Sequence, residues 1–193
     1  MIKKIAGQIS SYTFIVLVLL PFILTSCNKG GQEQKDVKKN DGSFSWKEKI
    51  GIEDIPDAPL KAFIKGQEIK IDYINFEKWR GSGDNVINWG DKKPAQPCGF
   101  VDNDLAIHFL RKAGDIVKGN ILKAGFDNNL DNYTLNYHYY EGGNIKKVSV
   151  PWNCALQIDE ITDDVVKGRI AICLKDDTKS WIAGKFEAVK CLN

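Results

Sequence analysis

The sequence lacks the short motifs that mark many enzymes. It contains no Gly-x-Ser-x-Gly elbow and no glycine-rich phosphate loop. Its only two histidines, His108 and His138, fall inside segments that alternate like strands. A histidine beside Cys98 would be one conceivable nucleophile pair, but Cys98 is more simply explained as half of a disulfide. We therefore expect a domain that is not an enzyme and needs no cofactor.

A basic block or arginine-rich face of the kind that binds nucleic acid is also missing. The whole chain has a formal net charge of +2. Residues 1–26 carry Lys3 and Lys4 and no acidic side chain, so the rest of the chain has 25 basic and 25 acidic side chains. This balance gives no reason to expect a nucleic-acid partner.

The apolar run near the N-terminus is too short to span a bilayer. It goes from Phe14 to Leu24 without a charged residue, whereas a spanning helix needs about 20 apolar residues. Pro21 would also weaken a continuous helix. Lys3 and Lys4 precede the run, and a positive start before a run of this length is typical of a secretory signal peptide.

The residues that follow, Leu24-Thr25-Ser26-Cys27, resemble the lipobox of bacterial lipoprotein precursors. The resemblance implies that the Cys27 thiol receives a diacylglycerol, that signal peptidase II cuts after Ser26, and that the new amino group is acylated. Two or three chains would anchor the protein stably to a lipid bilayer. Asn28, in place of Asp, favours the outer membrane in a host with two membranes. A plain secretory signal and an uncleaved anchor helix are the alternatives.

Residues 27–43 are expected to form a lipidated, flexible tether. Val37 is their only strongly apolar residue, and such a segment buries too little surface to offset its ordering entropy. Its average reach would be about 20–24 Å. Residues 44–193 are long enough for one domain with a sizeable core.

This domain reads as short strands separated by turns. Residues 105–110 alternate, and so do residues 133–140, which carry Tyr133, Leu135, Tyr137 and Tyr139 on one face. Glu141-Gly142-Gly143-Asn144 then forms a hairpin turn before residues 145–150. The pattern predicts an all-β fold, an antiparallel sandwich or barrel-like domain.

Three further strands end the chain, with turns at residues 162–164 and 176–180. Pairing Leu156 with Ile172, and Ile172 with Gly184, keeps apolar residues on one face. A slip of one residue would put Arg169 opposite Ile158, which the pattern disfavours. The alternative fold is α+β with one short helix near residues 114–125, although three glycines in that segment argue against it.

Four cysteines remain besides Cys27, and export would place them where disulfides persist. They are Cys98, Cys154, Cys173 and Cys191. Four cysteines allow three connectivities. In the register above, Cys154 and Cys173 point to opposite faces, which weakens that pair, and the other pairings stay open. No Cys-x-x-Cys pair is present, so a zinc site is disfavoured.

Two loops are candidate binding sites. Trp79-Arg80-Gly81-Ser82-Gly83 is followed closely by Trp89, and Trp79, Arg80 and Trp89 could bind a ligand from a loop on a rigid sheet. The alternative is that the tryptophans fill the end of the core. Asp127, Asn129 and Asp131 have the opening pattern of a calcium loop, but the glycine and glutamate of an EF-hand are missing. Ordinary turn chemistry is the simpler reading.

Two functions are consistent with these features. The first is a lipid-anchored envelope protein whose non-catalytic β domain acts in protein–protein contact or envelope structure, as an adhesin, inhibitor or accessory component. The alternative is a module that binds a small ligand, a glycan or calcium through its surface loops. The domain itself resembles only small β-rich envelope lipoproteins, a likeness of composition that implies no function.

Overall fold

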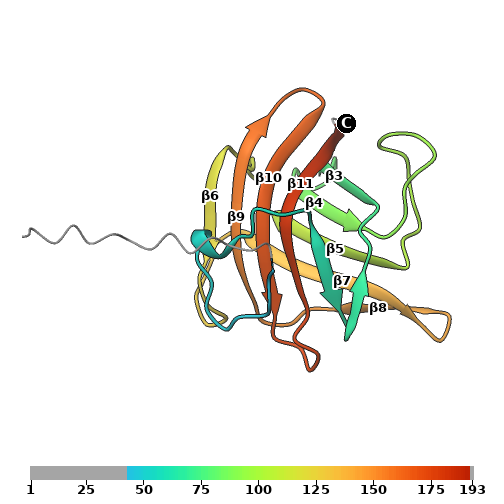
Figure 1. Cartoon of the computed structure of the whole chain (residues 1–193). Helices are drawn as coiled ribbons and strands as arrows, with labels where there is room; N and C mark the ends of the chain where they lie inside the picture. Colours follow the sequence, from blue (N-terminus) through green and yellow to red (C-terminus); the bar gives the residue numbers. More distant parts are fainter. Residues whose placement is uncertain (1–42, 192–193) are drawn as a thin grey trace, which may run out of the picture. The chain divides into compact units, whose positions relative to one another are not determined.

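The computed structural model describes residues 43–191. The expected signal peptide, the lipidation site Cys27 and all of the expected tether except Ser43 lie outside these residues. The described chain consists of a short 3-10 helix and eleven strands (Figure 1). In chain order they are η1 (Ile52–Asp54), β1 (Lys61–Ile64), β2 (Gln67–Ile69), β3 (Tyr73–Lys78), β4 (Asn85–Gly90), β5 (Leu105–Arg111), β6 (Gly119–Lys123), β7 (Tyr133–Glu141), β8 (Asn144–Val148), β9 (Trp152–Ile161), β10 (Val165–Leu174) and β11 (Trp181–Cys191).

The strands form one curled sheet that resembles half of a barrel (Figure 1). Their order is β6-β9-β10-β11-β3-β4-β5-β7-β8, and β1 pairs with both β11 and β2. The prediction of an all-β, barrel-like domain is confirmed. The sheet is mixed rather than purely antiparallel, because β11 and β3 run parallel.

The alternative with a helix near residues 114–125 is wrong. Gly119–Lys123 is strand β6, which pairs antiparallel with β9, and residues 114–118 are not helical. Gly119 has a φ of 127°, a conformation that glycine adopts at no steric cost. Within residues 43–191 no helix is both long enough and apolar enough to cross a membrane.

The main hydrophobic core fills the inside of the curl. Alternate side chains of β4, β5 and β7 point into it and meet side chains of β9, β10 and β11 from the other half of the sheet. Burying this apolar surface is the dominant force that favours folding. The large side chains that are almost completely buried there include Trp89, Phe109, Tyr137, Leu156, Ile172 and Ile182.

The C-terminal strands keep the predicted faces but not the predicted register. Leu156 pairs with Ile170 rather than Ile172, and Gly184 pairs with Ile170 rather than Ile172. Each register is therefore two residues away from the expected one. Because side chains alternate with a period of two, a shift of two residues leaves the apolar pattern unchanged, and the sequence pattern alone does not distinguish the two pairings.

The segment before β1 covers the outer face of β9, β10 and β11. Ile50 and Ile55 pack there against a row of small side chains. The row consists of Ala155, Ala171 and Ala183. Gly184 allows the residues just before β1 to run close to β11, because it has a φ of 134° and a Cβ at this position would lie 2.6 Å from the Leu60 Cα.

A disulfide joins Cys98 to Cys191, with their Cα atoms 5.5 Å apart. Cys98 lies in the loop between β4 and β5, and Cys191 is the last residue of β11. The two cysteines are 93 residues apart in the chain, and closing a loop of this length stabilises a fold by about 4–5 kcal/mol in the chain-entropy account. The bond ties the 91–104 loop to the sheet.

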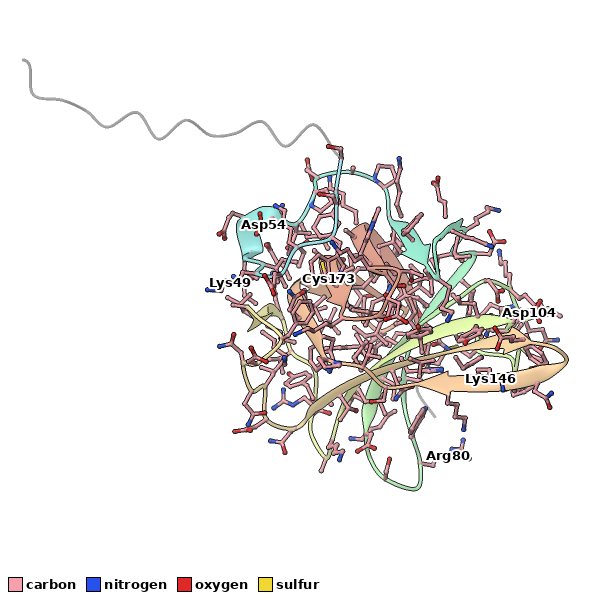
Figure 2. The ribbon with its side chains drawn as sticks, turned by 90° about the horizontal axis from the view of Figure 1, so that it is seen from below. Lys49, Asp54, Arg80, Asp104, Lys146 and Cys173 are labelled. Carbon is pink, nitrogen blue, oxygen red and sulfur yellow. A yellow bond between two sulfur atoms is a disulfide. The ribbon has the colours of Figure 1, made fainter. Side chains whose placement is uncertain are left out.

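The expectation of a second disulfide is wrong, since Cys154 and Cys173 are buried thiols. Cys154 pairs with Ile172, and Cys173 with Asn153, so their side chains point to opposite faces of the sheet. Cys173 lies under the N-terminal segment (Figure 2) and accepts a hydrogen bond from the Lys47 N–H at 3.3 Å. Burial raises the pKa of Cys173 to about 11 and also raises the pKa of Cys154, so both thiols stay protonated.

We expect iodoacetamide to label Cys154 and Cys173, but not Cys98 or Cys191, when the unreduced chain is unfolded in denaturant. Reduction should then expose all four. Peptide mass spectrometry locates the labels, and Cys27 is counted separately because its proposed lipidation would block alkylation. A labelled Cys98 before reduction, or a protected Cys154, would contradict the pairing.

Candidate functional site

A groove lies on the outer face of β3, β4, β5, β7 and β8, away from the main core. Its larger hollow has a volume of about 570 Å³, within the range of about 300–1,000 Å³ that is typical of small-molecule sites. A second hollow of about 350 Å³ beside the 91–104 loop shares Trp79, His108, His138 and Ile145 with the first. We call the two hollows together the outer groove. The rest of the larger hollow is lined by Asn136, Lys147, Val148 and Ser149.

Strand register places a row of polar side chains at the base of this groove. Asn75 pairs with Asn88, Asn88 with His108, and His108 with Asn136, across β3, β4, β5 and β7. Directly paired residues of antiparallel strands share a face, so all four point to the same side. The residues that follow or precede them in the chain belong to the core instead: Phe76, Ile87, Phe109 and Leu135.

Glu77 begins a chain of hydrogen bonds along the groove. Its Oε1 accepts hydrogen bonds from Trp79 Nε1 at 2.8 Å and from Asn88 Nδ2 at 2.9 Å. Asn88 Nδ2 also donates to Asn75 Oδ1 at 2.7 Å. Because an ionised carboxylate only accepts, the amide of Asn88 directs its nitrogen toward β3 and its oxygen toward β5.

The two histidines continue this chain to the 91–104 loop. His108 Nδ1–H donates to Asn88 Oδ1 at 2.6 Å, and His108 Nε2 lies 3.3 Å from His138 Nδ1. The two rings stack with their centroids 5.4 Å apart. His138 Nε2–H then donates to the backbone oxygen of Asn103 at 3.2 Å. The chain of hydrogen bonds therefore crosses four neighbouring strands and ends on the loop.

His108 is held in its neutral form. Burial, with smaller contributions from His138 and Lys147, lowers its pKa to about 4. A neutral imidazole that carries its proton on Nδ1 keeps a lone pair on Nε2. His108 therefore donates to Asn88 through Nδ1, and its Nε2 is an acceptor that faces His138 Nδ1.

Exposed apolar side chains surround this polar base. Trp79 is 39% exposed, Ile145 is 45% exposed and Phe100 is 94% exposed. Phe100 comes from the loop that the disulfide holds, and an ion pair of 2.9 Å between Lys92 and Asp104 joins the two ends of that loop. Apolar side chains gathered around a polar hollow are typical of binding sites.

The structure separates the three residues that the sequence grouped as a ligand site. Trp79 lies in the groove. Arg80 is exposed on the outlying turn between β3 and β4 (Figure 2) and does not line the groove. The prediction that Trp89 binds a ligand is wrong, because this side chain is completely buried. It packs against Phe186 with ring centroids 6.0 Å apart. Its position in β4 is one residue beyond outward-facing Asn88, so it points into the core.

The candidate calcium residues Asp127, Asn129 and Asp131 are exposed between β6 and β7. Asn129 Nδ2 donates to Asp131 Oδ1 at 2.5 Å, and Asn128 N–H donates to Gly125 O at 3.2 Å as part of a turn. Over residues 43–191, no group of three or more His, Cys, Asp and Glu side chains is arranged to hold a metal ion.

Sequence reasoning singled out the histidines but not the residues that connect them. Asn75 and Asn88 have one available signal, since each is a polar residue set between apolar residues of a strand, and Glu77 follows Asn75 by two positions. That alternation predicts an outward side chain, but it does not say which strands are neighbours. No protein-family model matches the chain, and neither a curated protein nor a solved structure matches it significantly.

The free energy of unfolding should fall as pH drops from about 6.5 to about 4, because His108 has its ordinary pKa of 6.5 only in the unfolded chain. Between pH 6.5 and pH 4 the unfolded chain therefore binds more protons at His108 than the folded chain does. The stability that neutral His108 contributes above pH 6.5 is lost as the pH falls through this range. The loss attributable to His108 approaches about 3 kcal/mol. Urea unfolding across pH should give a flatter profile for His108→Gln, and parallel profiles would contradict a neutral, buried His108.

Proposed function

We propose that this domain is a non-catalytic binding module that takes a small sugar or a similar polar molecule in the outer groove. One observation carries the proposal, namely the hydrogen-bond chain from Glu77 to Asn103 on the outer face of the sheet, beside the exposed ring of Trp79. Water can satisfy isolated polar groups on the solvent face of a sheet. A connected, half-buried polar base therefore supports a role in recognition.

The residue types in the groove suit a sugar. A sugar ring has an apolar face and an edge of hydroxyl groups that both donate and accept hydrogen bonds. Trp79 offers a flat apolar surface to such a face. Asn136 and Ser149 line the larger hollow, and their side chains make no hydrogen bond to another residue within 43–191, so they are available to the hydroxyl edge.

The same contacts favour binding over catalysis. Glu77 reaches His108 only through the amide of Asn88, and an amide does not take up the proton that a working acid–base pair must pass on. The cysteine–histidine pair considered from the sequence also loses support, because Cys98 is bonded to Cys191.

Protein–protein contact is the second candidate. Phe100 favours it, since a large apolar side chain that is 94% exposed on a disulfide-tied loop resembles the aromatic anchors of protein interfaces.

We also propose that the domain is exported and held at the bacterial envelope through Cys27, in the outer membrane of a host with two membranes. The lipobox-like residues 24–27 support this. The disulfide is in keeping with it, because such bonds persist in oxidising compartments.

Cys27→Ala should abolish processing and acylation, because transfer of the diacylglycerol needs the Cys27 thiol. Intact mass and detergent phase partitioning measure both outcomes. Cys154→Ala, which removes a buried thiol of the core, is the matched control and should be processed normally. A Cys27→Ala protein of mature size that still partitions into detergent would refute the anchor.

Trp79→Ala should weaken the binding of a monosaccharide by about tenfold or more, as expected for a central aromatic contact. Glucose, N-acetylglucosamine and glucuronate are suitable probes, and NMR titration of the protein measures their affinities. Leu122→Ala is the control, since Leu122 is 44% exposed on β6, outside the groove. The proposal fails if none of the probes binds, or if Leu122→Ala weakens binding as much as Trp79→Ala.

A further inference from the structure

The hydrogen-bond chain in the outer groove is complete only when the histidine pair carries one extra proton. Glu77 directs the amide of Asn88, so Asn88 Oδ1 accepts and His108 Nδ1 must donate. At the far end, the backbone oxygen of Asn103 only accepts, so His138 Nε2 must donate. One proton must still lie between His108 Nε2 and His138 Nδ1, which are 3.3 Å apart.

Two neutral histidines cannot satisfy all three contacts. With protons on His108 Nδ1 and His138 Nε2, the facing nitrogens each present a lone pair. Moving the His138 proton to Nδ1 repairs that contact but leaves Nε2 and the Asn103 oxygen as two acceptors facing each other. One added proton completes the chain and makes the pair cationic. Because His108 is the ring that burial disfavours as a cation, the charge belongs on His138.

Lys147 adds a second positive charge beside this pair. It is the direct ladder partner of His138 on β8, so both residues share the outer face. Lys147 is exposed and makes no ion pair with any acid in residues 43–191. No carboxylate lines the larger hollow, so the end of the groove at Lys147 is positive and has no acid among its lining residues.

The negative groups of the groove gather at the other end. Glu77 from β3 and Asp102 from the 91–104 loop line the smaller hollow. β4 contributes Asn88 and Gly90 there, and β5 contributes Ala106 besides the half-buried His108. The outer groove thus has one end that suits a negative group and another that repels it.

We propose that the outer groove selects an acidic sugar or a comparable small organic acid, whose carboxylate binds Lys147 Nζ beside the positively charged His138. The inference rests on the proposed binding function and deepens it by naming the charge of the ligand. The ligand body lies against Trp79 and Ile145, and its carboxylate faces the end of the groove that carries no acid. Asn136 and Ser149 remain available to its hydroxyl groups.

Two probes separate this inference from the binding function itself. Glucuronate and glucose differ by a carboxylate in place of a hydroxymethyl group, so NMR titration of the full chain compares the charge alone. Glucuronate should bind at least about tenfold more tightly, as expected for a charge-assisted hydrogen bond. Equal affinities would overturn the inference and leave the binding function standing, whereas binding of neither sugar would overturn both.

Lys147→Met should lose most of this preference for glucuronate while keeping the affinity for glucose. Lys146→Met is the matched control, because it removes the same charge from the adjacent residue of β8 (labelled in Figure 2). Lys146 pairs with Tyr139 and therefore points to the opposite face of the strand. Equal effects of the two substitutions would show that Lys147 acts only through the net charge of the domain. That result would overturn its assignment as the residue that binds the carboxylate.

His138 gives the inference a second readout. His138→Gln keeps a donor for the Asn103 oxygen but carries no charge, so it should lower the affinity for glucuronate and change the affinity for glucose little. Equal losses for the two sugars would show that His138 acts through the shape of the groove and not through a charge.

Discussion

Burial of one face of a single curled sheet is the constraint on which the rest of the structure depends. Side chains alternate across a strand, so every apolar residue that enters the core sends its chain neighbours outward. Ile87 and Trp89 face the core, and Asn88 between them faces the groove. The polar row outside is therefore a direct consequence of the packing inside, and the register that aligns the core residues also aligns Asn75, Asn88 and His108.

The outer face of the sheet is used differently in its two halves. Over β9, β10 and β11, small alanines let the N-terminal segment pack closely, and this half is structural. Over β3, β4, β5 and β7, polar residues leave the face open to solvent beside Trp79. The Cys98–Cys191 disulfide connects the two halves, because it ties the loop beside the groove to the end of β11. One half of the outer face is thus covered by the chain itself, and the other half holds the outer groove.

The histidine pair couples the stability of the fold to the charge of the groove. A proton on His138 completes the hydrogen bonds that run from Glu77 to Asn103, whereas a proton on His108 places a charge in a buried site. The two rings are in contact, so the charge on one discourages the charge on the other. The geometry therefore offers a place for one positive charge on the pair and opposes a second.

The sequence by itself determined the all-β class, the β7–β8 hairpin and the turns that bound β9, β10 and β11, because alternation and turn residues act over a few neighbouring positions. It also determined that Cys154 and Cys173 face opposite sides. Only the tertiary structure decided the two-residue register shift, the burial of Trp89, the pairing of Cys98 with Cys191 and the connection of Glu77 to the two histidines through Asn88. These features depend on which distant strands become neighbours, and a period of two carries no information about that choice.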